Sequence, residues 1–306
     1  MIDMSDVANN SIARLNIPAS IKNGNNAVVE LVSTEDKQVY WSWHLWFTDY
    51  KPSRTGDTAD NGKVHQYSNS VFQTGIYKDR YIMDRDLGAT IIDVKGDVTP
   101  TTDNATKFFG LFYQFGRKDP FIYANAISAN TLATYYDAGG NEMPTPDASA
   151  AAGSTSISFL AKAVMNPTTF YTNSGNWTKE RNGLWSELNG TTETDKSPFD
   201  PCPPGWRVPI DGTWAGFDNS NFGRYANGRR YTGGTLNINA YYPFSGQLLY
   251  DSGDLTRVGT LGLSRSATPN GQGNGYYIGF NPSNITSSDN NYGTFGFPVR
   301  CVQDRK

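Results

Sequence analysis

The sequence has few of the residues that most enzyme and metal sites use. Its 306 residues include only two cysteines and two histidines. His44 and His65 both lie in the first quarter of the chain, far from any serine or cysteine motif. A hydrolytic triad or a histidine-rich metal site is therefore not supported. Two cysteines are also too few to identify a redox compartment by number alone.

Strong charge and long apolar runs are missing as well. The net charge is −3 and no run of basic residues occurs, so the sequence lacks the electrostatic footprint of a nucleic-acid-binding protein. No apolar stretch approaches the roughly 18 residues of a transmembrane helix. The first ten residues, "MIDMSDVANN", do not have the pattern of a secretory signal. Either the protein is cytosolic or a targeting segment precedes this sequence.

Aromatic residues, glycine and proline are abundant instead. Aromatics make up 13% of the chain, which also has 31 glycines and 16 prolines, whereas hydrophobic residues reach only 37%. This composition predicts a loop-rich β or α+β protein with an aromatic core.

The N-terminal part predicts a β-hairpin. "VYWSWHLWFTDY" (39–50) alternates with period two, so its large apolar residues face one way and Ser42, His44 and Thr48 the other. "AVVELV" is a second strand and "STEDKQ" a polar turn between them. We interpret His44 as a solvated residue on the polar face. Residues 1–60 are assigned to an N-terminal β segment, and 61–306 to a second domain.

Two short helices are predicted further along the chain. "SISFLAKAVMNP" (156–167) has apolar residues at helical spacing, and Asn166-Pro167 should end it. "IDGTWAGF" (210–217) begins with the capping candidate Asp211 and carries Trp214 and Phe217 three residues apart. Residues 125–156 have few apolar anchors and indicate a long surface excursion.

Two motifs, about a hundred residues apart, support a resemblance to a known family. The first is Cys-Pro-x-Gly-Trp-x-x-Pro at 202–209, within a stretch that has five prolines in fourteen positions. The second is Gly-Phe-x-Val-Arg-Cys at 296–301. Together with "GIYKDRYIMDRDLGA" and "GLFYQFGRKDPF", they resemble the Fibrobacter succinogenes major paralogous domain, a family of Bacteroidetes surface proteins. The resemblance covers residues 65–304.

The resemblance implies a fold. The family looks like the formylglycine-generating-enzyme branch of the C-type-lectin-like fold, which implies an α+β domain with many loops. The residues before it resemble the strand pair that precedes this domain in fimbrillin-like proteins. The sequence departs from the family at Leu263-Ser264-Arg265-Ser266, where many members have Tyr-Trp-Ser.

The resemblance also implies a disulfide between Cys202 and Cys301. The alternative is two separate buried thiols. A disulfide would favour export, with the protein extracellular or on the outer-membrane surface.

The candidate ligand residues come from the composition of the C-terminal part. "TPNGQGNGYYIGFNPSNITSSDNNYG" (268–293) is rich in Asn, Ser, Tyr and Gly, the chemistry of adaptable binding surfaces. In lectin-like folds this region usually forms the ligand face. The predicted ligand-binding residues are Asn270, Asn274, Tyr276, Ser283, Asn284, Asn290 and Tyr292. Ordinary polar loops are the alternative. Tyr277 and Phe280 are assigned to the core. No cofactor is expected, although calcium is considered near "SSDNN" or "DNSN", neither of which has the spacing of a known loop.

Three functions follow as hypotheses. The first is an extracellular, non-enzymatic binding module that adheres to a glycan or surface protein. The second is a pilus or cell-envelope assembly subunit whose N-terminal strands pair with other fimbrial subunits. The third, a formylglycine-generating-type enzyme, lacks a catalytic cysteine pair, because both cysteines lie in the framework motifs. The charged groups Asp84-Arg85-Asp86 and "GRKDP" (116–120), with Arg207 and Arg300, are interpreted as structural pairs.

Overall fold

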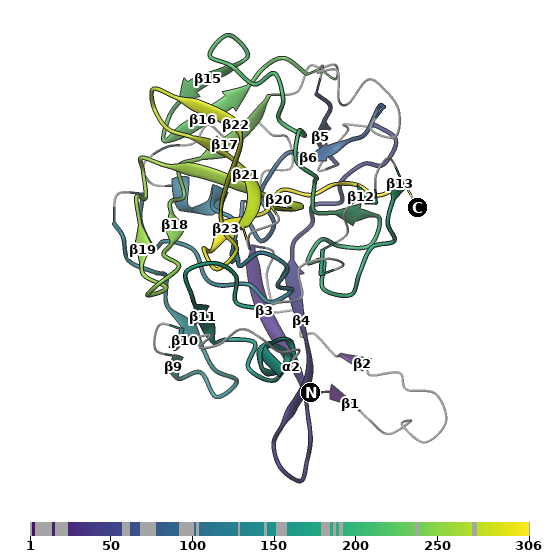
Figure 1. Cartoon of the computed structure of the whole chain (residues 1–306), viewed down its shortest axis with the longest axis vertical. Helices are drawn as coiled ribbons and strands as arrows, with labels where there is room; N and C mark the ends of the chain where they lie inside the picture. The colour runs from purple at the N-terminus through teal and green to yellow at the C-terminus, as the bar shows by residue number, and fades with distance from the viewer. Residues whose placement is uncertain are drawn as a thin grey trace.

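A computed structural model gives the architecture of the chain (Figure 1). It describes residues 2–3, 14–15, 24–56, 62–67, 78–91, 101, 104–127, 129–143, 146–150, 158–178, 184–185, 188–189, 192–234, 236, 239–270 and 274–305. Within these residues, no helix is both long and apolar enough to cross a bilayer.

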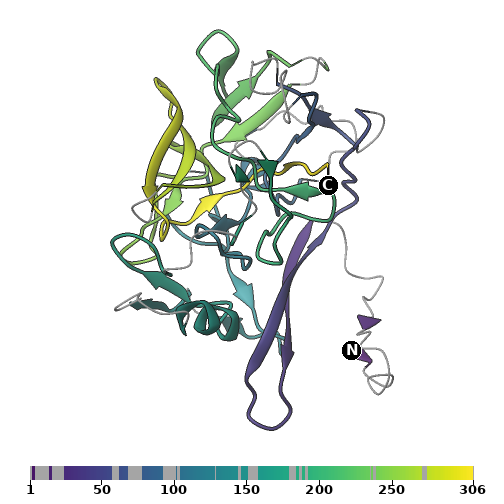
Figure 2. The same cartoon turned by 45° about the vertical axis from the view of Figure 1, so that its right-hand side comes forward.

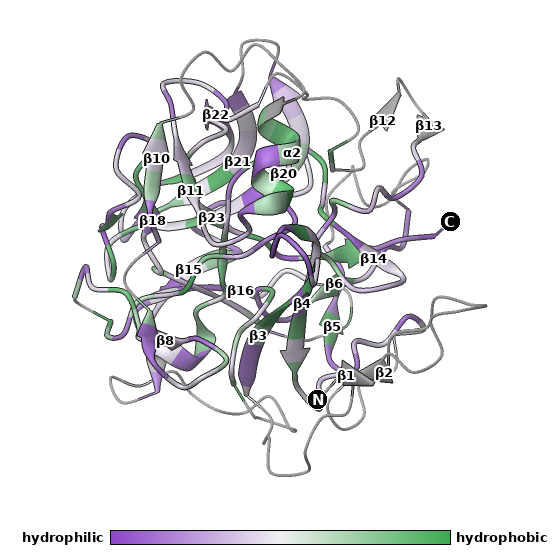
Figure 3. Ribbon diagram, turned by 90° about the horizontal axis from the view of Figure 1, so that it is seen from below, coloured by the Kyte–Doolittle hydropathy of each residue, from purple (hydrophilic) through white to green (hydrophobic). Residues whose placement is uncertain are grey.

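The fold is β-rich, so the predicted α+β class is wrong. In the described part of the chain, the one α-helix is α2 (Ser158–Met165). A short 3-10 helix, η2 (Ala105–Phe108), occurs earlier in the sequence. The helix expected over 156–167 is confirmed as α2, in which Phe159 and Ala163 are buried. Figure 3 shows hydrophobic and hydrophilic segments side by side on α2.

The second predicted helix, "IDGTWAGF", is a series of turns instead. Gly212 and Gly216 have φ values of 84° and 89°, in the left-handed region that interrupts a right-handed helix. Trp214 and Phe217 are nevertheless buried in an aromatic cluster. The spacing therefore identified the buried side chains but not the backbone that carries them.

The strands are short and form many small sheets. Their bounds are β1 Ile2–Asp3, β2 Arg14–Leu15, β3 Asn25–Val32, β4 Val39–Phe47, β5 Val64–His65, β6 Ile82–Met83, β7 Phe112–Tyr113, β8 Tyr135–Tyr136, β9 Glu142–Met143, β10 Ala148–Ala150, β11 Phe170–Thr172, β12 Leu188–Asn189, β13 Thr192–Glu193, β14 Trp206–Arg207, β15 Phe222–Tyr225, β16 Gly228–Tyr231, β17 Ala240–Pro243, β18 Gln247–Leu248, β19 Leu255–Thr256, β20 Gly262–Asn270, β21 Asn274–Phe280, β22 Ile285–Tyr292, β23 Phe297–Pro298 and β24 Val302–Gln303. The two main three-stranded sheets have the orders β15-β16-β17 and β20-β21-β22.

A four-stranded sheet brings the two sequence motifs together. Its order is β14-β24-β6-β5, so the strand within the proline-rich stretch pairs with β24, which directly follows the Gly-Phe-x-Val-Arg-Cys motif. Cys202 and Cys301 form a disulfide with their Cα atoms 5.9 Å apart. The predicted Cys202–Cys301 bond is confirmed, and it closes a loop with a sequence separation of 99 residues.

The core is built largely from aromatic rings. In one cluster, the ring of Tyr67 lies 4.8 Å from that of Phe217 in an edge-to-face arrangement, and Phe217 stacks on Tyr231 at 4.4 Å. Edge-to-face and offset contacts of this kind stabilise beyond the area they bury. A core of this type explains how a chain with few aliphatic residues can fold into many short strands.

The predicted N-terminal hairpin is confirmed as β3 and β4. It extends away from the rest of the molecule (Figure 2). Several polar contacts fasten it to the rest of the molecule. Among them, Ser42 Oγ donates to Asp119 Oδ1 at 2.6 Å, Trp46 Nε1 to Ala89 O at 3.1 Å, and Asn26 Nδ2 to Gly88 O at 2.8 Å. The boundary between residues 1–60 and 61–306 stays a prediction.

The side of this hairpin that was predicted to face solvent is covered by the rest of the molecule. His44 contacts Asn26 Oδ1 at 2.9 Å and Tyr113 Oη at 3.2 Å, and burial lowers its pKa to about 4. Our interpretation of His44 as solvated is therefore wrong. The side of the hairpin that carries Ser42 and His44 makes hydrogen bonds to the rest of the molecule. On the other side, Trp43 is 47% exposed.

Candidate functional site

The register of β20, β21 and β22 gathers most of the predicted ligand residues. Asn270 lies opposite Asn274, Asn274 opposite Tyr292, and Tyr276 opposite Asn290. Directly opposed residues in an antiparallel sheet project from the same face, as do alternate residues of one strand. These five residues therefore share one face at one end of the sheet, and we call them the polar face.

Two asparagine amides of the polar face are hydrogen-bonded to each other. Asn274 Nδ2 donates to Asn290 Oδ1 at 2.9 Å, which fixes the orientation of both amides. Asn274 Oδ1 is buried and has no hydrogen-bond partner within the described residues. Buried polar atoms are rarely left unpaired. Because this oxygen is covered, a ligand would contact the outer side chains of the polar face rather than this atom.

The two tyrosines of the polar face differ in their surroundings. Tyr292 packs edge-to-face against Tyr250 at 5.0 Å and stacks near Phe295 at 6.5 Å, so its ring is held in an aromatic wall. Tyr276 is half-buried, and its hydroxyl makes no hydrogen bond within the described part of the chain. Tyr276 is thus the more available of the two to contact a ligand.

Ser283 and Asn284 lie elsewhere. They are in the exposed turn between β21 and β22, where both backbone N–H groups donate to Asn281 Oδ1 at 2.8 Å. Asn274 is at the opposite end of β21, so the turn and the polar face are separated by about 20 Å of strand. The structure does not bring these two residues to the other five.

The opposite face of the same sheet rests on the body of the molecule. A Cβ atom added at Gly275 would lie 2.3 Å from the ring of Phe115, so the two are in close contact. Tyr277 is buried, as predicted, and its hydroxyl donates to Asp289 Oδ2 at 3.0 Å. Burial raises the pKa of Tyr277 to about 12. The polar face thus has a rigid backing.

Arg265 is a buried residue of this backing that sequence reasoning did not select. Its Nη2 donates to Phe295 O at 3.0 Å and its Nη1 to Gly275 O at 3.2 Å. The guanidinium lies 3.9 Å from the ring centre of Phe297, and burial lowers the pKa of Arg265 to about 9. The only sequence signal was that Arg265 lies in the segment that departs from the family pattern.

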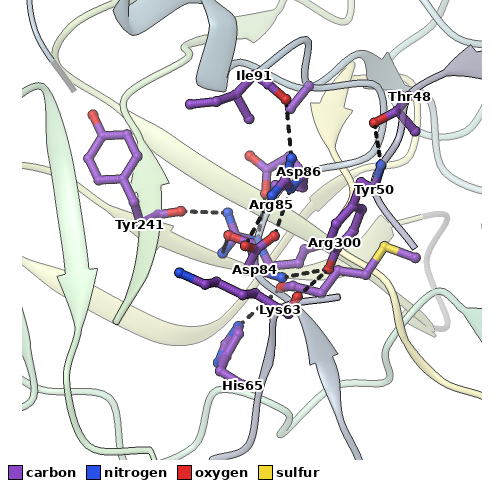
Figure 4. A network of polar contacts seen from close by, with 12 residues as sticks. Thr48, Tyr50, Lys63, His65, Asp84, Arg85, Asp86, Ile91, Tyr241 and Arg300 are labelled. Carbon is purple, nitrogen blue, oxygen red and sulfur yellow. Dashed lines mark hydrogen bonds and ion pairs between the residues drawn. The ribbon is translucent and has the colours of Figure 1, made fainter. Parts of the chain in front are cut away.

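The charged residues of the family motifs form a buried framework (Figure 4). Arg300 Nε donates to Asp86 Oδ1 at 2.8 Å, and its Nη2 donates to Tyr241 O at 2.7 Å. Arg85 pairs with Asp84 at 2.7 Å. Burial raises the pKa of Asp86, although Arg300 acts in the opposite direction. The structural interpretation of Asp84-Arg85-Asp86 and Arg300 is confirmed.

His65, the second histidine, belongs to the same framework (Figure 4). Its Nε2–H donates to Met83 O at 3.1 Å. Burial, and then the charge of Arg300, hold the pKa of His65 well below its usual range. His65 is therefore neutral at physiological pH and structural in its contacts.

The other charged residues singled out from the sequence are also structural. Lys118 pairs with Asp119 at 2.7 Å, and Arg117 Nη2 donates to Asn166 O at 2.9 Å. Arg207 lies 3.5 Å from Asp304 in an ion pair. All three cations are buried.

The acidic residues considered for calcium are engaged within the chain. Asp289 Oδ1 accepts the N–H of Asn290, and Asp218 Oδ1 accepts the N–H of Ser220 at 2.7 Å. A search of the described residues finds no group of three or more His, Cys, Asp or Glu that could hold a metal ion. Calcium binding stays a prediction. Both cysteines are in the disulfide, so the chain has no free thiol.

Comparison with known proteins adds no relative. No family model, curated protein or solved structure matches the chain. The resemblance to the major paralogous domain therefore rests on the motifs themselves, and it stays a prediction.

Proposed function

We propose that the chain is an extracellular, non-enzymatic binding module of a cell-surface or fimbrial protein, which adheres to a glycan or a surface protein through the polar face. The observation that carries this proposal is the register that collects Asn270, Asn274, Tyr276, Asn290 and Tyr292 on one face. Asparagine amides and tyrosine rings offer hydrogen bonds and flat apolar area to the same ligand.

Three further features support this proposal. The hydrogen bond from Asn274 Nδ2 to Asn290 Oδ1 holds two amides of the polar face in one orientation. The rigid backing by Gly275, Tyr277 and Arg265 means that the polar face needs little reordering when a ligand binds. The confirmed disulfide fits an oxidising, extracellular environment.

A glycan and surface-protein array, run with calcium and with chelator, tests the proposal. We expect a specific hit that weakens about tenfold or more in Y276A/N290A, because aromatic anchors contribute much of the energy of an interface. The matched control is S283A/N284A, whose sites lie at the other end of the same hairpin and should leave the hit unchanged. A blank array with folded protein, or a hit insensitive to Y276A/N290A, contradicts the proposal; loss in chelator alone adds a metal to it.

A second candidate function is assembly through the β3–β4 hairpin. The exposed large apolar residues of the described chain are Leu31, Val32, Tyr40 and Trp43, all on this hairpin or its bulge, and Tyr136. Among the described strands, β3 and β4 pair only with each other, so their outer edges are available to another strand. Exposed apolar strands with open edges are typical of association surfaces.

Light scattering of the purified chain tests this second function. We expect dimers or larger assemblies in the wild type that dissociate in L31E/W43E, because two charges disfavour burial of that apolar face. Y136E is the control, since Tyr136 is the one exposed large apolar residue outside the hairpin among the residues that the structure describes. A wild type that stays monomeric as its concentration rises would exclude self-assembly through β3 and β4.

A further inference from the structure

The β15–β16 hairpin has positive charge that the carboxylates of the described residues leave unpaired. It lies at the end of the molecule opposite the β3–β4 hairpin (Figure 1). Arg224 on β15 is directly opposite Arg229 on β16, with Arg230 next in sequence. No carboxylate of the described residues pairs with any of these arginines. Like charges directly opposite each other destabilise a strand pair.

Arg229, which faces the charge of Arg224, is held in place by its own hydrogen bonds. Arg229 is buried, and its Nε donates to Asn281 O at 2.9 Å while its Nη1 donates to Asn219 Oδ1 at 3.0 Å. Burial, and then the charge of Arg224, lower the pKa of Arg229. Arg224 is exposed, so the uncompensated charge is available to an anion from outside.

Arg230 is positioned to bind an anion with both of its N–H pairs. Its guanidinium lies 4.1 Å from the centre of the Tyr225 ring. Stacking on a tyrosine orients the guanidinium and leaves its in-plane N–H groups free for a carboxylate or sulfate. The residue opposite Arg230 on β15 is Gly223, and a Cβ atom added there would have nothing within 4 Å. Open space therefore lies beside Arg230.

We propose that the β15–β16 hairpin binds an acidic polysaccharide, whose sulfate or carboxylate groups pair with Arg224 and Arg230. These two arginines leave opposite faces of the hairpin, because opposed pairs and alternate residues share a face. A chain of repeated anionic groups can reach both, whereas a single small anion reaches one. The disulfide fits an extracellular polymer, which favours an acidic polysaccharide over a nucleic acid.

This site is separate from the polar face, and the proposal does not depend on ligand binding there. Its link to the predicted residues is the bond from Arg229 to Asn281 O, which holds the turn of Ser283 and Asn284 against the hairpin. These two residues were predicted as ligand contacts, and the structure separates them from the polar face. They border the arginine hairpin instead.

Binding to immobilised dextran sulfate, carboxymethyl dextran and neutral dextran tests the proposal. We expect the full chain to bind one or both acidic polymers and not neutral dextran. The affinity of R224A/R230A for the same polymer should be lower by about tenfold or more. G223D keeps both arginines but places a carboxylate opposite Arg230, and it should weaken binding similarly. The acidic polymer that binds identifies the anionic group.

Matched control variants distinguish binding at this site from non-specific attraction to any exposed cation. K51A/K162A also removes two exposed cations and should bind as the wild type does, as should Y276A/N290A. The proposal is overturned if neither acidic polymer binds, if R224A/R230A binds unchanged, or if K51A/K162A loses as much. Tighter binding to a single-stranded DNA oligonucleotide that R224A/R230A abolishes would overturn the assignment to a polysaccharide. Thermal unfolding of each variant verifies that it is folded.

Discussion

Replacing Cys202 and Cys301 by alanine should lower the free energy of unfolding by about 4–5 kcal/mol. The bond closes a loop with a sequence separation of 99 residues, and its loss restores that much chain entropy to the unfolded state. Both cysteines are also buried in the same hydrophobic cluster, beside Trp206. The pair therefore connects the proline run to the closing strand at the centre of the molecule.

Urea unfolding of the double variant measures this loss. The control is the wild type in reductant, which should lose a similar free energy, while the double variant should be insensitive to reductant. A loss below about 1 kcal/mol, or equal sensitivity of both proteins to reductant, would show that the disulfide does not hold the motifs together.

Breaking the ion pair between Arg300 and Asp86 should cost about 3–5 kcal/mol for either single substitution. In R300M the carboxylate of Asp86 is left buried without its cation, and in D86N the guanidinium loses its carboxylate. Arg300 also donates to Tyr241 O and lies 3.6 Å from the ring centre of Tyr242. These extra contacts should make R300M the more damaging of the two.

A double-mutant cycle separates the pair from its surroundings. D86N/R300M should cost clearly less than the sum of the single losses, because the second substitution removes the charge that the first left unpaired. D251A, at an exposed aspartate, should change stability by about 0.5 kcal/mol or less. Additive losses in the cycle would mean that the two charges do not stabilise each other.

The sequence predicted the elements whose signal is local or carried by a motif. The alternation in "VYWSWHLWF" corresponds to β4, and the helical spacing before Asn166-Pro167 corresponds to α2. The disulfide followed from the resemblance, not from any spacing rule. The hydrophobic pattern of residues 210–217 failed as a helix because two glycines with positive φ turn the backbone, which a count of apolar spacing does not register.

The candidate site was predicted in composition but not in arrangement. Polar richness identified residues 268–293, yet only pairing decides which side chains share a face. The length of β21 places Ser283 and Asn284 far from Asn274. The sequence also did not predict which side of the β3–β4 hairpin is exposed. The side with Ser42 is covered because Ser42 bonds to Asp119, which is distant in the sequence.

The most direct test of the binding module is a hydrogen-exchange footprint with the strongest ligand from the array. Amide exchange of the full chain is compared with and without that ligand, and Y276A/N290A serves as the control. We predict slower exchange over residues 274–277 and 289–292, and no such change in the variant. Protection confined to the β3–β4 hairpin, with residues 274–277 and 289–292 unaffected, would contradict the assignment of the polar face as the ligand-binding surface.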